Sequence, residues 1–191
     1  MKMKPDQKYW HKAKAEQNIT TDPPAFIWAI KMNILQILRI VGRDKFVNGK
    51  GEMLVKMNSL FTIGKDTGEK IDEGTLQRYL AELVWYPSFA LSEYIVWEEI
   101  DTYSAKATMT YKGTKASGVF YFDSNGKIER FSTLRYMGND DDKRYEWIAT
   151  IKEYSIFGGI RVPSKMEATW RLDKGYWTWL NLEVLEMNYD T

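Results

Sequence analysis

The residue types that most often carry out chemistry in proteins are scarce in this sequence. Its 191 residues include no cysteine and one histidine, His11. Without cysteine, the chain has no thiol nucleophile, thiolate metal ligand or disulfide. A Ser–His–acid triad would have to use His11, and a site with several histidine ligands is ruled out. We interpret His11 as a surface residue of the first strand and expect no metal ion or other cofactor.

Carboxylates are the remaining candidates for acid–base chemistry. Glu82 precedes Trp85 by three residues in a segment with helical spacing, so both side chains project to similar sides of that helix. If this side faces the interior, Glu82 needs a partner such as Arg78 or an arginine on a strand; the alternative is an exposed helix acid. Asp140–Asp142 fit a solvated turn, because the central Gly and distal Glu of a calcium-binding loop are missing. Gly64–Gly68 lacks the strand–loop–helix order of a phosphate loop.

Large apolar side chains are abundant: aromatic residues make up 15% of the chain, with eight Trp, and there are nine Met. Such rings either fill a core or offer apolar area to a ligand, and Met side chains adapt to varied partners. In one curved sheet, the following would crowd a common interior: Phe26, Trp28, Met32, Trp85, Tyr86, Trp97, Phe120, Trp147, Trp177 and Trp179. The candidate ligand-binding residues are Trp28, Met32, Glu82, Trp85, Tyr86, Trp97, Phe120 and Trp147.

Strands are the elements that must position these side chains. Apolar and polar residues alternate over 26–32, 53–61 and 105–112, which predicts strands with one face buried. Asn48-Gly49 predicts a tight hairpin, because a type I′ turn needs positive φ at both central positions. Comparable turn signals lie at Lys112–Thr114, Asp123–Gly126, Gly158-Gly159 and Asp173–Gly175. Together they predict nine or ten strands in a meander.

One segment, residues 72–86, has helical spacing instead, with Asp72 as a candidate N-cap and Pro87 as the stop. We therefore predict a mainly β (α+β) fold. It would be a large curved antiparallel sheet, or an unclosed barrel, with this helix packed on its concave face. Gly118 would permit the sheet to coil. The chain is expected to form a single domain over 1–191. Its first fourteen residues or so, a segment rich in lysine, are expected to be frayed.

The sequence resembles an uncharacterised prokaryotic family, a domain of unknown function, from about Ala15 onward. The residues that carry this resemblance are Gly51-Glu52-Met53, Leu80, Glu82, Val84–Pro87, Val96-Trp97-Glu98, Ser104–Thr108, Gly159–Pro163 and Trp170. This resemblance implies no activity.

A weaker resemblance is to the lipoprotein-localisation carriers (LolA-like proteins) and related lipid-binding lipoproteins. It rests on Ala15–Gln17, Pro24–Trp28 and Asp44–Gly49. The resemblance implies an unclosed antiparallel barrel whose concave side, covered by helices, holds an acyl chain. Those carriers have a secretion signal and several lid helices, whereas this sequence shows no such signal and one helix.

Charge and hydropathy exclude some partners. The 27 basic and 26 acidic residues give a net charge of +1, which argues against general attraction to nucleic acid. No run of about 18 apolar residues is present, so we expect no transmembrane segment. No signal peptide is visible, so we expect a cytoplasmic protein or the soluble part of a longer, anchored chain.

Three functions stay open at this point. The first is non-enzymatic binding of an apolar ligand, a lipid or acyl chain, on the concave side of the sheet. The second is a protein-interaction or scaffold module with a filled core, which would use Tyr176–Trp179 as an exposed patch. The third is an enzyme that depends on a carboxylate such as Glu82. We favour the first.

Overall fold

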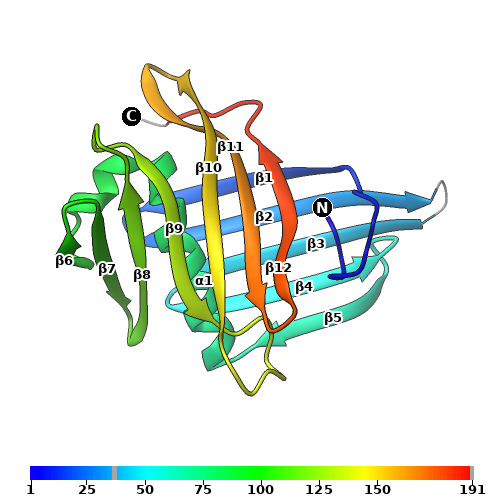
Figure 1. The fold of residues 1–191 in the computed structure, drawn as a ribbon. Coiled ribbons are helices and arrows are strands. Elements are labelled where there is room, and N and C mark those ends of the chain that lie inside the picture. Colours follow the sequence, from blue (N-terminus) through cyan, green and yellow to red (C-terminus); the bar gives the residue numbers. More distant parts are fainter. Residues whose placement is uncertain (36–37, 190–191) are drawn as a thin grey trace.

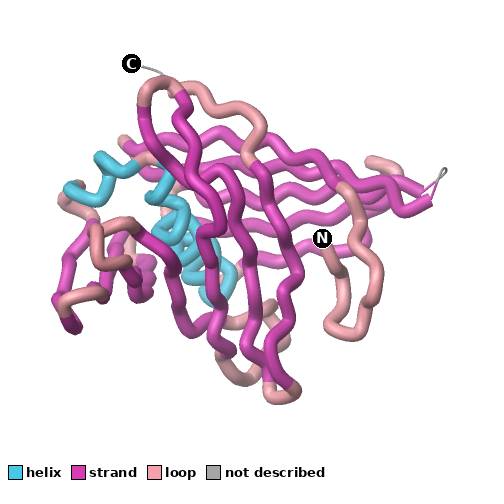
Figure 2. Tube along the Cα trace, turned by 45° about the horizontal axis from the view of Figure 1, so that its top comes forward, coloured by secondary structure: helices cyan, strands magenta, loops and turns pink. Residues whose placement is uncertain are grey.

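The computed structural model describes residues 1–35 and 38–189. Two antiparallel sheets lie one in front of the other, with their strands crossing at a steep angle, and a helix lies between them at one end (Figure 1). Figure 2 shows the same two layers after rotation. The predicted fold class is confirmed. The described part of the chain forms twelve strands, which are divided between two sheets. Nine or ten strands in one sheet were predicted.

The first sheet contains five strands in chain order. They are β1 (Ala13–Thr21), β2 (Pro24–Leu35), β3 (Leu38–Val47), β4 (Lys50–Met57) and β5 (Phe61–Thr67). The predicted hairpin at Asn48-Gly49 joins β3 to β4, and both residues have positive φ, 54° and 79°.

The second sheet contains seven strands, also paired in chain order. They are β6 (Ile95–Asp101), β7 (Ser104–Tyr111), β8 (Thr114–Phe122), β9 (Ile128–Arg135), β10 (Tyr145–Phe157), β11 (Ile160–Leu172) and β12 (Gly175–Glu183). The other four predicted turns fall between consecutive strands of this sheet.

Helix α1 (Glu69–Ala81) begins three residues earlier and ends five residues earlier than the predicted 72–86, and two 3₁₀ turns follow it, Glu82–Trp85 and Pro87–Leu91. Asp72 is therefore not the N-cap. Its buried carboxylate instead accepts hydrogen bonds from the Gly51 N–H at 2.7 Å and the Lys50 ammonium at 2.9 Å. These bonds attach the first turn of α1 to β4.

The helix packs into a core that we call the helix core. It contains Phe26, Phe46, Leu76, Tyr79, Leu80, Tyr86, Phe89, Phe120 and Phe131. Burying such side chains stabilises the fold by about 1.5–3 kcal/mol each. Gly118 has a different role from the predicted one: the Phe131 ring lies directly over its backbone, where a Cβ atom would clash. The glycine thus makes room for a core ring.

The second sheet is split at one edge of the helix core. The ladder between β8 and β9 extends no further than Val119 opposite Ser132, so the strands separate beyond that pair. Side chains bridge the separation: Thr133 Oγ1 donates to the Ser117 carbonyl at 2.6 Å, and Gln77 Nε2 donates to Thr133 Oγ1 at 2.9 Å. A helix side chain therefore occupies a position where strand hydrogen bonds would otherwise run.

Residues 1–12 lie beside β12, where the Lys2 N–H donates to the Trp179 carbonyl at 2.7 Å (Figure 1). None of the helices formed by the described residues has the length and apolar character that crossing a bilayer requires.

Candidate functional site

A charged network lies between the two sheets, beside the helix core. Arg78 of α1 donates to Glu82 at 2.7 Å, to Asp44 of β3 at 2.9 Å and to Gln17 of β1 at 2.7 Å. Gln17 in turn donates to the second Glu82 oxygen at 2.6 Å. The prediction that Glu82 needs Arg78 as its partner is confirmed, and the alternative of an exposed helix acid is wrong, since Glu82 is 9% exposed.

Burial and charge compete in this network. Burial lowers the pKa of Arg78, but Glu82 and Asp44 more than offset that effect, so the pKa lies above its ordinary value. Burial raises the pKa of Asp44, and Arg78 opposes the increase. The Arg78 guanidinium also lies 4.9 Å from the ring centre of Phe26 and 4.7 Å from that of Trp28. Arg78 is therefore a fully paired cation that joins the helix to the first sheet.

The inner face of the second sheet carries a group of four indoles that we call the tryptophan layer: Trp147, Trp170, Trp177 and Trp179. Trp147 of β10 pairs with Trp170 of β11, which pairs with Trp177 of β12, so these three share one row and one face. The β11–β12 register shifts between Ala168 and Thr169, leaving Trp179 as the extra residue of a bulge. Trp147 and Trp170 are 7% exposed and belong to the same buried cluster as the helix core, and Trp177 and Trp179 are partly buried against that cluster.

Arg135 lies at one end of the tryptophan layer. Arg135 ends β9, and its guanidinium lies 5.2 Å from the Trp147 ring centre and 5.6 Å from that of Trp170. A Cβ atom on Gly74 of α1 would lie 3.0 Å from Arg135 Nη2, which places the guanidinium against the helix. Burial, and secondly the like charge of Arg78, lowers the pKa of Arg135 to about 10. The side chain therefore stays charged at neutral pH.

Several donors on this face have no acceptor. Within the described residues, Arg135 forms no ion pair, and its Nε is buried without a hydrogen-bond partner. The indole N–H groups of Trp147, Trp177 and Trp179 are buried and unpartnered as well. An unsatisfied buried donor costs about 1–3 kcal/mol, so four on one face demand an explanation.

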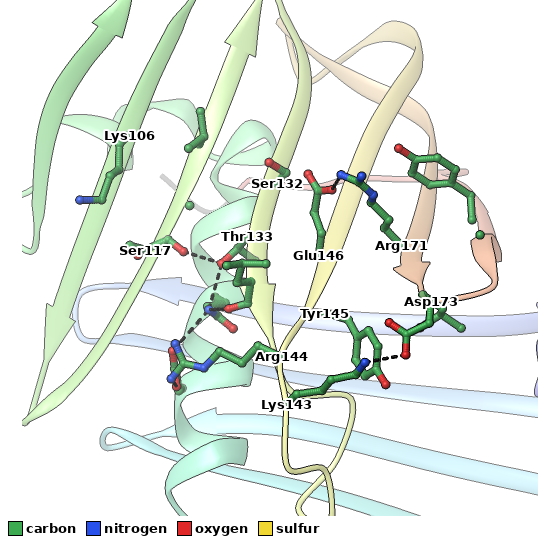
Figure 3. A pocket seen from close by; sticks show the side chains of 18 residues that line it. Lys106, Ser117, Ser132, Thr133, Lys143, Arg144, Tyr145, Glu146, Arg171 and Asp173 are labelled. Carbon is green, nitrogen blue, oxygen red and sulfur yellow. Dashed lines mark hydrogen bonds and ion pairs between the residues drawn. The ribbon is translucent and has the colours of Figure 1, made fainter.

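A depression of about 1010 Å³ lies over the split between β8 and β9, at the outer face of the second sheet (Figure 3). Charged side chains around it pair with each other: Lys143 with Asp173 at 2.5 Å, Arg144 with Glu73 at 2.7 Å, and Arg171 with Glu146 at 3.5 Å. Because these charges are matched within the protein, the depression is less suited than the Arg135 region to attract a charged ligand.

The predicted ligand-binding residues divide into three groups. Trp28 and Glu82 adjoin Arg78, and Trp147 belongs to the tryptophan layer. Tyr86 and Phe120 are buried in the helix core. These two rings are therefore structural and do not line a site.

The remaining three predicted residues lie elsewhere. Trp85 donates its indole N–H to the Pro163 carbonyl at 2.9 Å, which joins the first 3₁₀ turn to β11. Met32 is 3% exposed on β2 and lies outside the helix core. Trp97 lies on the edge strand β6, where its ring packs at a tilt against Phe120 with the ring centres 5.4 Å apart and its indole N–H donates to the Ala90 carbonyl. The structure thus does not gather all eight residues into one site.

Sequence reasoning missed Arg135 and Trp170. The available signal for Arg135 was its parity, because it alternates with Phe131 and Thr133 and so projects to the inner face of β9. The Asp140–Asp142 loop contacts Lys70, whose ammonium donates to the Asn139 and Asp141 carbonyls at 2.9 and 2.7 Å. Over residues 1–35 and 38–189, no group of three or more His, Asp or Glu side chains is arranged to hold a metal ion.

Comparison with known proteins agrees with the first resemblance seen in the sequence. No curated protein and no solved structure matches the chain, so the resemblance to lipoprotein-localisation carriers is not supported. A family model matches residues 1–189. The chain therefore belongs to a family of unknown function, DUF6920, whose model matches almost the whole sequence given.

Proposed function

We propose that this protein binds the apolar part of a small molecule between its two sheets, against the tryptophan layer, without catalysing a reaction. The observation that carries the proposal is that large apolar side chains face inward and yet keep contact with solvent. In the helix core, Tyr79 and Phe120 are fully buried, whereas Trp28, Trp177 and Trp179 are partly exposed. Ligand sites are typically mostly apolar, with a few placed polar groups.

The arrangement of Glu82 favours binding over catalysis. Arg78 donates to one Glu82 oxygen and Gln17 to the other, so the carboxylate is held by two protein partners. A general base must instead be within reach of the proton it removes from a substrate. Glu82 thus serves better as an anchor for Arg78 than as an acid or base.

Native mass spectrometry of the gently purified protein, followed by solvent extraction, tests the proposal. We expect an additional mass that extraction releases and identifies as a lipid or another amphipathic molecule. The blocking variant is Trp177→Glu, which places a carboxylate in the layer. Its matched control is Tyr176→Glu, one residue earlier on β12, where the side chain is 69% exposed. Circular dichroism would verify that both variants fold.

The two variants decide the outcome. The proposal expects Trp177→Glu to purify without the additional mass and Tyr176→Glu to retain it. Equal amounts of bound molecule in both variants would place the ligand away from the tryptophan layer. The proposal would be overturned if the wild type showed only the mass of the polypeptide and also bound no added apolar probe.

A protein-interaction module is the second candidate, through a surface other than the one predicted. Tyr176–Trp179 loses its principal support, because Trp177 and Trp179 pack against the core. A different apolar group is exposed at the β4–β5 turn, where Leu60, Phe61 and Ile63 are 76%, 63% and 56% exposed. Exposed apolar clusters of this kind often mark partner surfaces. A co-purifying protein in the same mass spectra would favour this candidate.

A further inference from the structure

We infer that the ligand of the tryptophan layer carries one negatively charged group that only accepts hydrogen bonds, a carboxylate at the end of an apolar chain, and that Arg135 is its counter-ion. This inference rests on the proposed function and adds the chemistry of the head group. It follows from the types of the unpartnered groups, their places on the sheet and the charge beside them.

The unpartnered groups in the layer are all donors. An indole ring has one N–H and no acceptor, and a guanidinium has five N–H donors and no acceptor. Trp147, Trp177, Trp179 and Arg135 each contribute at least one buried donor without a partner. A ligand group that satisfies Arg135 and Trp147, whose ring centre lies 5.2 Å from the guanidinium, must therefore supply acceptors. A carboxylate supplies two oxygens that can each accept more than one hydrogen bond.

The charge beside these donors favours an anion. Arg78 already holds the two nearby carboxylates, Asp44 at 2.9 Å and Glu82 at 2.7 Å. Among the described residues no carboxylate lies within 4.0 Å of the Arg135 guanidinium, so Arg135 has no direct ion-pair partner, and Asp44, Glu73 and Glu82 attract it only from a longer distance. A buried charge without a partner is costly, and a ligand carboxylate would compensate it. The guanidinium fork also matches the two oxygens of a carboxylate.

The position of Arg135 determines where the chain would run. Arg135 pairs with Tyr145, the first residue of β10, and the inner face of β10 continues through Trp147 and Ala149 to Ile151. Neighbouring inward residues on β11 and β12 are also apolar, with Met166 and Leu180 partly buried. From Tyr145 to Ile151 the strand extends about 20 Å, enough to accompany a long alkyl chain. The head group would lie at Arg135 and the chain along β10–β12.

Isothermal titration calorimetry with three probes that share one alkyl chain tests the inference. Laurate carries the carboxylate, lauryl alcohol is neutral, and lauryl trimethylammonium is positive. The variants are Arg135→Met, Arg135→Lys and Trp147→Phe. Arg171→Met is the matched control, because Arg171 lies on the outer face of β11 and pairs with Glu146. Circular dichroism and thermal melts would establish that each variant is folded before binding is compared.

We expect the wild type to prefer laurate to both other probes. Arg135→Met should weaken laurate about 10- to 100-fold and leave lauryl alcohol within about threefold, because the lost contact is to a charged group. Arg135→Lys, which keeps the charge and loses the fork, should fall between wild type and Arg135→Met. Trp147→Phe keeps an aromatic ring and removes one donor, so laurate should weaken by about 3- to 10-fold.

Two outcomes would overturn the inference in distinguishable ways. If laurate and lauryl alcohol bind the wild type and Arg135→Met equally, apolar binding stands and the carboxylate assignment is wrong. If none of the probes binds the wild type, the proposed function fails, and the head-group assignment fails with it. A preference for lauryl trimethylammonium, or an effect of Arg171→Met as large as that of Arg135→Met, would also contradict Arg135 as the counter-ion.

Discussion

The helix core and the tryptophan layer lie next to each other between the same two sheets. They differ in whether their buried polar atoms have hydrogen-bond partners. In the helix core, polar atoms that accompany large rings are satisfied: the Tyr79 hydroxyl donates to the Thr20 carbonyl and the Tyr86 hydroxyl to the Tyr79 carbonyl. In the tryptophan layer, three indole N–H groups are buried without an acceptor. Packing explains the first region, whereas the second has polar groups that packing alone does not account for.

The two inter-sheet arginines show the same difference in a single residue type. Arg78 donates to two carboxylates and an amide, and its pKa is raised. Arg135 lies against two indole rings without a carboxylate partner, and its pKa is lowered to about 10. The contrast indicates that Arg78 stabilises the fold and that Arg135 is retained at a cost in stability.

The largest expected effect on the free energy of unfolding comes from the loss of Arg78. Arg78→Met would leave Asp44 and Glu82 as carboxylates without their cation between the sheets, so we expect the free energy of unfolding to fall by about 3–5 kcal/mol. Urea denaturation followed by circular dichroism measures this change. The control is Arg144→Met, which breaks a more exposed ion pair with Glu73 and should cost at most about 1 kcal/mol. Similar losses in both variants would contradict the structural role of Arg78.

Loss of Arg135 is expected to increase the free energy of unfolding, whereas loss of Arg78 decreases it. Arg135→Met removes a buried charge that has no ion-pair partner and leaves an apolar side chain against Trp147 and Trp170, so the free energy of unfolding should rise by about 1–3 kcal/mol in ligand-free protein. The same urea experiment, performed after solvent extraction of any bound lipid, measures it. A loss of stability as large as that of Arg78→Met would show that the two arginines have the same role and would remove the contrast.

The stability that Arg135→Met gains over the wild type is expected to depend on pH, and this pH dependence is a smaller effect. Because the pKa of Arg135 is lowered from its ordinary value to about 10 in the folded protein, the folded chain binds fewer protons than the unfolded chain above about pH 10. The destabilisation due to its charge is therefore fully present below pH 10 and is relieved as the pH rises further. The advantage of Arg135→Met over the wild type should thus begin to shrink at about pH 10 and shrink further up to about pH 11.

This pH series compares two variants at each pH, so the ionisation of tyrosines common to both cancels from the difference. Burial raises the pKa of Tyr79 and Tyr86, and both contribute equally to the wild type and Arg135→Met. An advantage that stays constant up to pH 11 would contradict the lowered pKa of Arg135.

The elements of the fold could largely be predicted from the sequence because local rules govern them. Asn48-Gly49 specified a hairpin through backbone conformation, whereas Pro87 did not mark the end of α1, which ends at Ala81 and is followed by two 3₁₀ turns. The beginning of the helix was predicted wrongly, because Asp72 resembles an N-cap while its carboxylate bonds to Gly51, a partner on another strand. The division into two sheets was also missed, since alternation shows which face of a strand is buried and not which sheet the strand joins.

The site was predictable only in part. The helical spacing of Arg78 and Glu82 gave their ion pair correctly. Aromatic content alone could not separate Phe120, a sealed core ring, from Trp147, whose indole N–H lacks a partner, because both have the same alternation pattern. The unpaired state of Arg135 depends on where Asp44 and Glu82 lie in space, so no local pattern reveals it.

The order of strands has a consequence for how the protein folds. Every strand pairs only with its neighbours in the chain, β1 to β5 in one sheet and β6 to β12 in the other. Most loops between consecutive strands are short, the 136–144 loop between β9 and β10 being longer, so the entropy lost in closing most hairpins is small. We expect each sheet to assemble from its own hairpins, and the Glu69–Leu91 segment that connects them to bring the two together last. The surface that this final step would close includes the tryptophan layer.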